Sequence, residues 1–229
     1  MTTGLYRLDE FKDNCGFGMI AHLKGDASHK LLTTAIEALA CMTHRGGIAA
    51  DGKTGDGCGL LLQKPDSFMR AVAKTDCNAE LSDVYAVGAV MLSRDIDSRT
   101  IAEAALVLEV EALGLSVAGW RELPVDNSCL GPIALESQPV FKHLFINSEG
   151  LSSVELNAKL FVVRRKVEKA LEDDSTFYIS SLSSTVVSYK GLMMPVDLPR
   201  FFIDLADESL ETAAGRYDGI WARELKHWE

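Results

Sequence analysis

The sequence predicts an α+β fold in which helices cover the faces of layered sheets. Segments with apolar residues at helical spacing are interspersed with short apolar segments typical of strands over the 229 residues. Several of the strand-like segments follow one another closely, as in antiparallel hairpins. The chain is 47% hydrophobic and 24% charged, as in an ordinary globular protein. This length suits one large domain or two small ones with a sizeable core.

The first elements follow a polar segment, residues 1–14. An apolar strand is expected over residues 17–23 and a helix over residues 28–43, where the hydroxyl of Ser28 can cap the first turn. Apolar residues recur through that helix at helical spacing: Leu31, Leu32, Ala35, Ile36, Leu39 and Met42. Gly46 or Gly47 supplies the positive φ with which helices commonly end.

The later elements are predicted from the same two periodicities. Small hydroxyl side chains alternate on one face of the strand over residues 177–182, where they either line a polar site or face solvent. Strands are expected over residues 60–62, 84–92, 116–120, 140–146, 177–182 and 185–189, and helices over residues 65–74, 97–113 and 153–172.

Charge and cysteine content exclude several classes of protein. A net charge of −10 argues against nucleic-acid binding, which needs a surplus of lysine and arginine, but permits a small anionic or zwitterionic ligand. The five cysteines are odd in number and none are spaced C-x-x-C, so a disulfide framework, a zinc ribbon and an iron–sulfur site are weakly supported. With no apolar signal core and no run of about 18 apolar residues, we expect no membrane association and a cytoplasmic location.

Cys15 lies in the segment Asn14-Cys15-Gly16-Phe17-Gly18 and has two interpretations. It is either a small buried hydrophobe or a nucleophile. If the chain were cut before Cys15, its own α-amine, with a pKa of about 7.7–8.0, could accept the thiol proton. The match of residues 16–21 to a dinucleotide-binding loop is disfavoured, because such a loop follows a strand and opens a helix.

Arg45 and the glycine-dense loop behind it also allow two interpretations. Arg45 is either a surface charge at the end of a helix or an electropositive group that favours a nearby thiolate. His44 is expected to be structural, because no other metal ligands cluster with it. Asp56 and the glycines at positions 55, 57 and 59 form either a ligand-binding loop or a tight turn that enters a buried strand.

Six segments occur in order along the chain: Asn14-Cys15-Gly16-Phe17-Gly18, His44-Arg45-Gly46-Gly47, the glycine loop of residues 53–59, Phe177-Tyr178, Tyr189-Lys190-Gly191 and residues 201–207. Together they resemble the N-terminal glutaminase domain of the large subunit of glutamate synthase, a class II glutamine amidotransferase. The resemblance covers residues 10 to about 213 and implies an N-terminal-nucleophile hydrolase-like αββα four-layer sandwich. It divides the chain into a leader (residues 1–14), a partial amidotransferase domain (residues 15–213) and a divergent C-terminal tail (residues 214–229).

The resemblance implies a cysteine-dependent hydrolysis of glutamine to glutamate and ammonia. Removal of the leader makes Cys15 the first residue, and its thiolate attacks the side-chain amide to give a thioester. Arg45 matches an arginine that lies near the nucleophile in the family. In the complete family enzyme, ammonia reaches 2-oxoglutarate beside FMN, which iron–sulfur clusters reduce. Those regions lie beyond this chain, so we expect it to bind neither cofactor.

The end of the sequence departs from the family pattern. The family continues into a His-x-Arg-Phe-Ser-Thr-Asn strand, whose arginine grips the substrate carboxylate, and an Asn-Gly-Glu oxyanion motif. Residues 215–229 show neither, so we expect impaired catalysis and an incomplete sandwich. Residues 216–229 have apolar residues at helical spacing.

The departure leaves a second function open. The chain is alternatively a non-catalytic binding or assembly module, paired with a chain that supplies the missing half or with other glutamate synthase subunits. An unrelated α/β protein is the third possibility.

Overall fold

A computed structural model of the chain describes residues 16–43 and 47–219, and it contains two four-stranded antiparallel sheets. The first sheet has the strand order β1 (Gly16–Ala21), β8 (Ala214–Gly219), β2 (Cys58–Gln63) and β7 (Val186–Gly191). The second has the order β4 (Ser116–Glu122), β5 (Val140–Asn147), β3 (Tyr85–Leu92) and β6 (Tyr178–Ser183).

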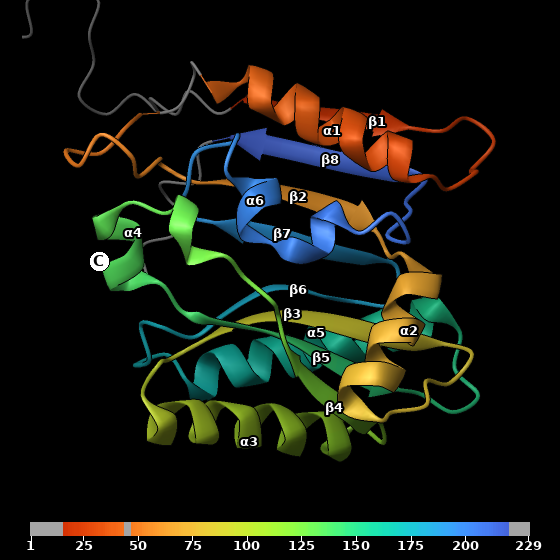
Figure 1. Cartoon of the computed structure of the whole chain (residues 1–229). Helices are drawn as coiled ribbons and strands as arrows, with labels where there is room; N and C mark the ends of the chain where they lie inside the picture. Colours follow the sequence, from red (N-terminus) through yellow and green to blue (C-terminus); the bar gives the residue numbers. More distant parts are fainter. Residues whose placement is uncertain (1–15, 44–46, 220–229) are drawn as a thin grey trace, which may run out of the picture.

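Helices cover the outer sides of this arrangement. Figure 1 shows α1 (His29–Cys41) against the first sheet, and α3 (Ile96–Ala112) and α5 (Ser153–Ala170) against the second. The other described helices are α2 (Asp66–Cys77), α4 (Pro132–Ser137) and α6 (Leu198–Phe201), with short 3₁₀ turns η2 (Asn127–Cys129) and η3 (Ile203–Ala206). The predicted α+β class and layered arrangement are confirmed.

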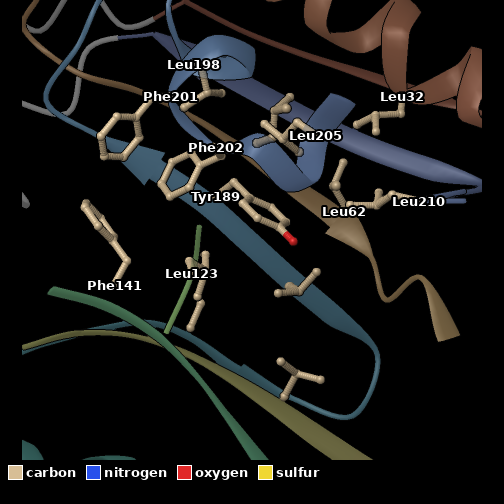
Figure 2. Packing of buried hydrophobic residues seen from close by; sticks show 14 of the residues in the cluster. Leu32, Leu62, Leu123, Phe141, Tyr189, Leu198, Phe201, Phe202, Leu205 and Leu210 are labelled. Carbon is tan, nitrogen blue, oxygen red and sulfur yellow. The ribbon is translucent and has the colours of Figure 1, made fainter. Parts of the chain in front are cut away.

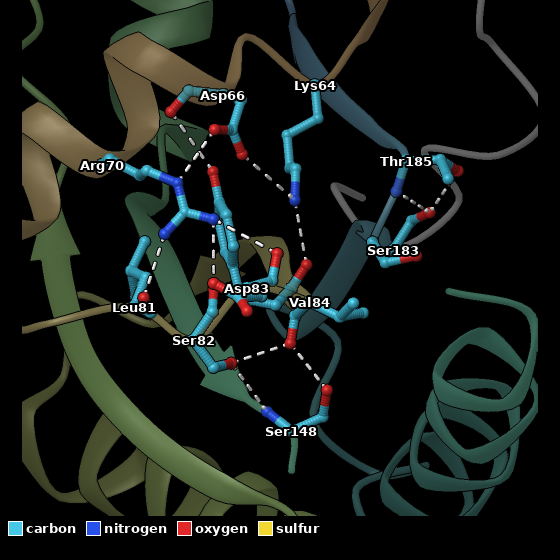
Figure 3. A network of polar contacts seen from close by, with 12 residues as sticks. Lys64, Asp66, Arg70, Leu81, Ser82, Asp83, Val84, Ser148, Ser183 and Thr185 are labelled. Carbon is cyan, nitrogen blue, oxygen red and sulfur yellow. Dashed lines mark hydrogen bonds and ion pairs between the residues drawn. The ribbon is translucent and has the colours of Figure 1, made fainter. Parts of the chain in front are cut away.

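The termini of the helices follow from local sequence. Ser28 caps α1, because its hydroxyl accepts a hydrogen bond from the Leu31 N–H at 3.2 Å. In α2, Arg70 donates to the carbonyl oxygens of Leu81 and Ser82, which fixes the loop that leads into β3 (Figure 3). A side chain therefore fixes the start of α1, and another ties α2 to the loop that follows it.

Two hydrophobic cores hold the layers together. The larger contains α1, α2, β2, β7 and the α6–η3 segment, and aromatic side chains such as Tyr189, Phe201 and Phe202 dominate it (Figure 2). The smaller lies between the second sheet and helices α3 and α5, and Leu106 and Leu160 are buried in it. Burial of this much apolar surface is the main source of stability.

Strand β8 is the main difference from the sequence-based prediction. Ala214–Gly219 lies between β1 and β2 and pairs with both, in the interior of the first sheet. The helical spacing expected from residue 216 therefore does not describe this segment, which is extended. The division of the chain at residue 214 itself stays a prediction.

A search of the described ranges, 16–43 and 47–219, finds no helix long and apolar enough to cross a membrane.

Candidate active site

The two residues predicted to be catalytic, Cys15 and Arg45, lie outside the described residues, as does His44. The structure describes Gly16, which follows Cys15, and Gly47, two positions after Arg45. Cys15 is bonded to Gly16, the first residue of β1, which pairs with Gly219 of β8. Gly16 and Gly47 therefore mark where the two predicted residues join the described part of the chain.

The glycine-dense loop after Arg45 is a tight hairpin-like turn. Asp56 Oδ2 accepts a hydrogen bond from the Gly47 N–H at 2.6 Å, and Ile48 forms a bridge with Gly55. A side chain at Gly47 would overlap the Asp56 carboxylate, so this position requires glycine. For Gly55 and Asp56 the structure thus favours the tight turn over the ligand-binding loop, and no group of three potential metal ligands occurs within the described residues.

Asp51 anchors the same loop to helix α4. Its carboxylate accepts hydrogen bonds from the hydroxyl of Thr54 and from the N–H groups of Thr54 and Lys53. These bonds, the Thr54 hydroxyl first, hold the pKa of Asp51 well below its ordinary value. The Thr54 hydroxyl in turn accepts a hydrogen bond from the Ala134 N–H of α4 at 3.3 Å.

A cavity of about 110 Å³ lies beside strands β2, β7 and β8 of the first sheet. Because β8 pairs with β1, this cavity is next to the strand that Cys15 precedes. Four strands contribute to its lining, which includes Gly59 and the polar residues Ser180, Ser188, Lys190, Arg216 and Asp218.

Strand register explains why these residues meet. Gly59 of β2 faces Asp218 of β8 on one side and Lys190 of β7 on the other, and Asp218 also faces Phe17 of β1. Side chains of directly paired residues lie on the same face of a sheet. A Cβ atom on Gly59 would lie 2.8 Å from the Cβ of Lys190, so the row is open only because this residue is glycine.

The charged groups of the cavity differ in burial. Lys190 is buried, and its Nζ donates to the Tyr178 hydroxyl at 3.0 Å. Arg216 is exposed; its guanidinium lies 5.4 Å from the Phe17 ring centroid, and its Nη2 is 3.6 Å from Asp218 Oδ2. The cavity therefore has an inner cation, an outer cation and a carboxylate, which suits a ligand with charges of both signs.

Small hydroxyls complete the inner wall. The hydroxyls of Ser180 on β6 and Ser188 on β7 lie 2.6 Å apart, and Ser180 also donates to the Ala89 carbonyl at 3.1 Å. Of the two interpretations of the alternating hydroxyls, the structure supports the polar lining for Ser180.

None of the four described cysteines lines this cavity. Cys58 is fully buried, and burial raises the pKa of its thiol far above the ordinary value. Burial likewise raises the pKa of Cys77 and Cys129. Cys41 is exposed on α1. These thiols therefore offer no competing nucleophile in the cavity.

Sequence reasoning alone did not identify most of the cavity residues. Lys190 belongs to the motif Tyr189-Lys190-Gly191, and Arg216 belongs to the tail that departs from the family motif. Neither segment by itself indicates that its charged residue lines a cavity. The structure nonetheless places an arginine, Arg216, at the cavity. These residues come together because β8 pairs with β1 and β2. The paired segments are some 150 to 200 positions apart, so no local sequence pattern predicts the pairing.

Comparison with known proteins identifies the family. The family model for class-II glutamine amidotransferases matches residues 15–218, from the candidate nucleophile to the end of the cavity-lining strand. The chain is 37% identical over 213 residues to the glutamate synthase [NADPH] large chain of Bacillus subtilis, a match that covers 92% of this chain and 14% of that protein.

Two further relatives give the same picture. The chain is 33% identical over 215 residues to the glutamate synthase [NADPH] large chain of Azospirillum brasilense, covering 92% of this chain and 14% of the relative. It is 36% identical over 202 residues to the glutamate synthase [NADH] of Schizosaccharomyces pombe, covering 85% and 10%. The chain thus spans about a seventh or less of the length of these relatives, and it belongs to the class-II glutamine amidotransferase family.

Proposed function

We propose that the chain hydrolyses L-glutamine to L-glutamate and ammonia through a thioester on Cys15. The observation that carries this proposal is the family match that begins at Cys15, directly before strand β1, whose pairing partner β8 lines a charged cavity. We also propose that residues 1–14 are removed, so that Cys15 becomes the first residue of the working protein.

The reaction proceeds in two steps that share one base. The α-amine of Cys15, with a pKa of about 7.7–8.0, accepts the thiol proton, and the sulfur attacks the side-chain amide carbon of glutamine. The C–N bond breaks, the leaving nitrogen takes up the proton, and ammonia departs. Water then attacks the thioester, the C–S bond breaks, and glutamate and the free thiol are released. Arg45 supplies positive charge that favours the thiolate.

The charges of the cavity support an α-amino acid as substrate. Arg216 and Lys190 are cations suited to an α-carboxylate, and Asp218 is an anion suited to an α-ammonium group. The sequence predicted impaired catalysis partly because the family's carboxylate-binding arginine is missing. Arg216 at the cavity weakens that reason, because it is a cation that can bind a carboxylate.

The relatives suggest the wider context. Because they are glutamate synthases, we propose that the ammonia serves the formation of glutamate from 2-oxoglutarate, in a cytoplasmic pathway of nitrogen assimilation. In this proposal FMN and iron–sulfur clusters bind to other parts of a synthase, and this chain binds glutamine and associates with those parts.

The decisive experiment measures glutaminase activity of the purified chain, with its first residue established by intact mass. Cys15→Ala is expected to lower the rate at least about 1,000-fold, because it removes the nucleophile. Cys41→Ala, which alters an exposed thiol of α1, is expected to leave the rate unchanged. A Cys15→Ala protein that keeps its rate contradicts the proposal. Glutamine binding without turnover in the unsubstituted chain instead favours the non-catalytic binding module.

A further inference from the structure

We propose that Lys190 determines the specificity of the cavity by binding the α-carboxylate of the amino acid from the inner wall, together with Arg216 from the outer side. This inference rests on the proposed function, since it assumes that the cavity of β2, β7 and β8 receives an α-amino acid. It assigns a binding role to a residue that sequence reasoning gave none.

Lys190 is both buried and held in place. Only 4% of its surface is exposed, although it lines the cavity. Its Nζ donates to the Tyr178 hydroxyl at 3.0 Å and lies 4.8 Å from the centroid of the Tyr178 ring. A lysine normally loses much side-chain entropy when it binds an anion, and this one is already ordered. Its position therefore favours ligand binding by reducing the cost of ordering.

Gly59 leaves space for the α-carboxylate of the substrate in the row of paired residues Phe17–Asp218–Gly59–Lys190. Lys190 and Asp218 flank it on the same face of the sheet, and Gly59 has no side chain to fill the space between them. The α-carboxylate would face Lys190 and the α-ammonium would face Asp218, whose side chain is 14% exposed. Opposite charges on either side of a glycine thus match the two charges of an amino acid.

Arg216 occupies a different position from Lys190. Its side chain is 54% exposed and packs on Phe17 beside Asp218. Exposed ion pairs contribute little because water screens them, whereas charge-assisted hydrogen bonds at buried groups are stronger. We therefore expect the inner cation, Lys190, to contribute strongly to carboxylate selection.

Lys64 provides a matched comparison within the same protein. It is also a largely buried lysine: its Nζ lies 3.3 Å from the centroid of the Tyr85 ring and donates to the Tyr85 carbonyl at 3.0 Å (Figure 3). It does not line the cavity. A purely structural lysine of this kind would support its tyrosine without discriminating between ligands.

The test measures binding by calorimetry in the full chain with Cys15→Ala, so that glutamine is not consumed. The ligands are L-glutamine and 4-aminobutanamide, which is glutamine without its α-carboxylate. Lys190→Met is expected to weaken glutamine binding about 10- to 100-fold and to leave 4-aminobutanamide binding within about twofold. Tyr178→Phe, a milder change, is expected to weaken only glutamine binding, by a few-fold. Lys64→Met is expected to alter neither.

Three outcomes overturn the inference. Equal losses for both ligands in Lys190→Met and Tyr178→Phe show that Lys190 only supports the structure. Unchanged glutamine affinity in Lys190→Met shows that Arg216 binds the α-carboxylate without help from Lys190. No glutamine binding by the Cys15→Ala chain removes the premise. The turnover assay of the Cys15 protein decides the proposed function separately, because carboxylate selection measured by binding stands even where hydrolysis is absent.

Discussion

At the scale of single residues, the shape of the cavity depends on Gly59. Its neighbour across the β2–β7 ladder is Lys190, and a Cβ atom at position 59 would lie 2.8 Å from the Lys190 Cβ and 3.3 Å from the Tyr189 carbonyl oxygen. Both of these atoms belong to or adjoin the backbone, so neither moves away cheaply. The open space beside Lys190 therefore requires the absence of a side chain.

We predict that Gly59→Ala lowers the free energy of unfolding by about 1–3 kcal/mol through overpacking, and weakens glutamine binding. Gly215→Ala is the matched control, because its added Cβ would lie 3.3 Å from Leu62 Cδ2 and 3.8 Å from the Ala35 Cβ, on the side of the sheet that faces α1. Urea unfolding and calorimetry check both. Normal glutamine binding by Gly59→Ala contradicts the proposed site.

Residues of the site differ in how far the sequence predicts them. Cys15 was identified because its neighbours form a motif along the chain, and the family match starts there. Lys190, Asp218 and Ser180 carry no such local pattern, because strand pairing between distant segments brings them together. Chemical type alone does not distinguish a buried lysine at a cavity from one that packs on a ring, as Lys64 does.

At the scale of elements, helix α5 shows how a local sequence fixes where a helix begins. The Ser152 hydroxyl accepts a hydrogen bond from the Glu155 N–H at 3.3 Å, and Glu155 Oε2 accepts one from the Ser152 N–H at 2.9 Å. This reciprocal pair is a capping box. The helix then buries Leu156, Leu160 and Val163 against the second sheet.

Ser152→Ala is predicted to lower the free energy of unfolding by about 1 kcal/mol, because it leaves helix N–H groups without their acceptor. Ser153→Ala, one position later, lies within the helix and is expected to change it by less than about 0.5 kcal/mol. Thermal or urea denaturation of the two variants measures the difference. Equal effects would show that the capping box does not stabilise α5.

The long helices and most strands were predicted at the right places, because apolar periodicity and capping residues are local properties. Strand β8 was not, because Ala-Gly-Arg-Tyr-Asp-Gly lacks the alternation of an ordinary strand. The extended conformation of β8 is stabilised by pairing with β1 and β2, which its own side-chain pattern does not predict. Helix α4 was also missed, since its six residues are too few for a helical period to stand out.

At the scale of the whole molecule, a buried polar cluster joins the two sheets. Arg121 of β4 donates to both oxygens of Asp204, at 2.7 and 2.9 Å, and the Tyr189 hydroxyl of β7 donates to Asp204 at 3.2 Å. Arg121 also donates to Asp76 of α2 at 2.6 Å. His143 of β5 lies beside this cluster, fully buried, with no hydrogen-bond partner for either ring nitrogen among the described residues.

His143 predicts a pH dependence of stability. Burial lowers its pKa to about 4 from an ordinary value of about 6.5, with the attraction of Asp204 opposing and the repulsion of Arg121 adding to the shift. The unfolded chain takes up a proton below about pH 6.5, whereas the folded chain does not until about pH 4. Stability is therefore unaffected by this group above pH 6.5 and falls as the pH decreases toward 4.

Lowering the pH from 7 to 5 is expected to decrease the free energy of unfolding by about 2 kcal/mol, because His143 takes up a proton in the unfolded chain but not in the folded one. Urea unfolding at the two pH values measures the change, and His143→Met is expected to remove most of it. His22→Met, at an exposed histidine, serves as the control and should keep the full decrease. An unchanged pH dependence in His143→Met would show that other groups cause it.

In the mechanism that we propose, Cys15 acts through a free α-amine on the same residue. The most direct test compares the glutaminase rate of a chain that begins at Cys15 with that of the same chain carrying one additional glycine before it, which converts the α-amine into an amide. The chain that begins at Cys15 is expected to hydrolyse glutamine at least about 100-fold faster than the chain with the added glycine. Equal rates in the two forms would contradict it.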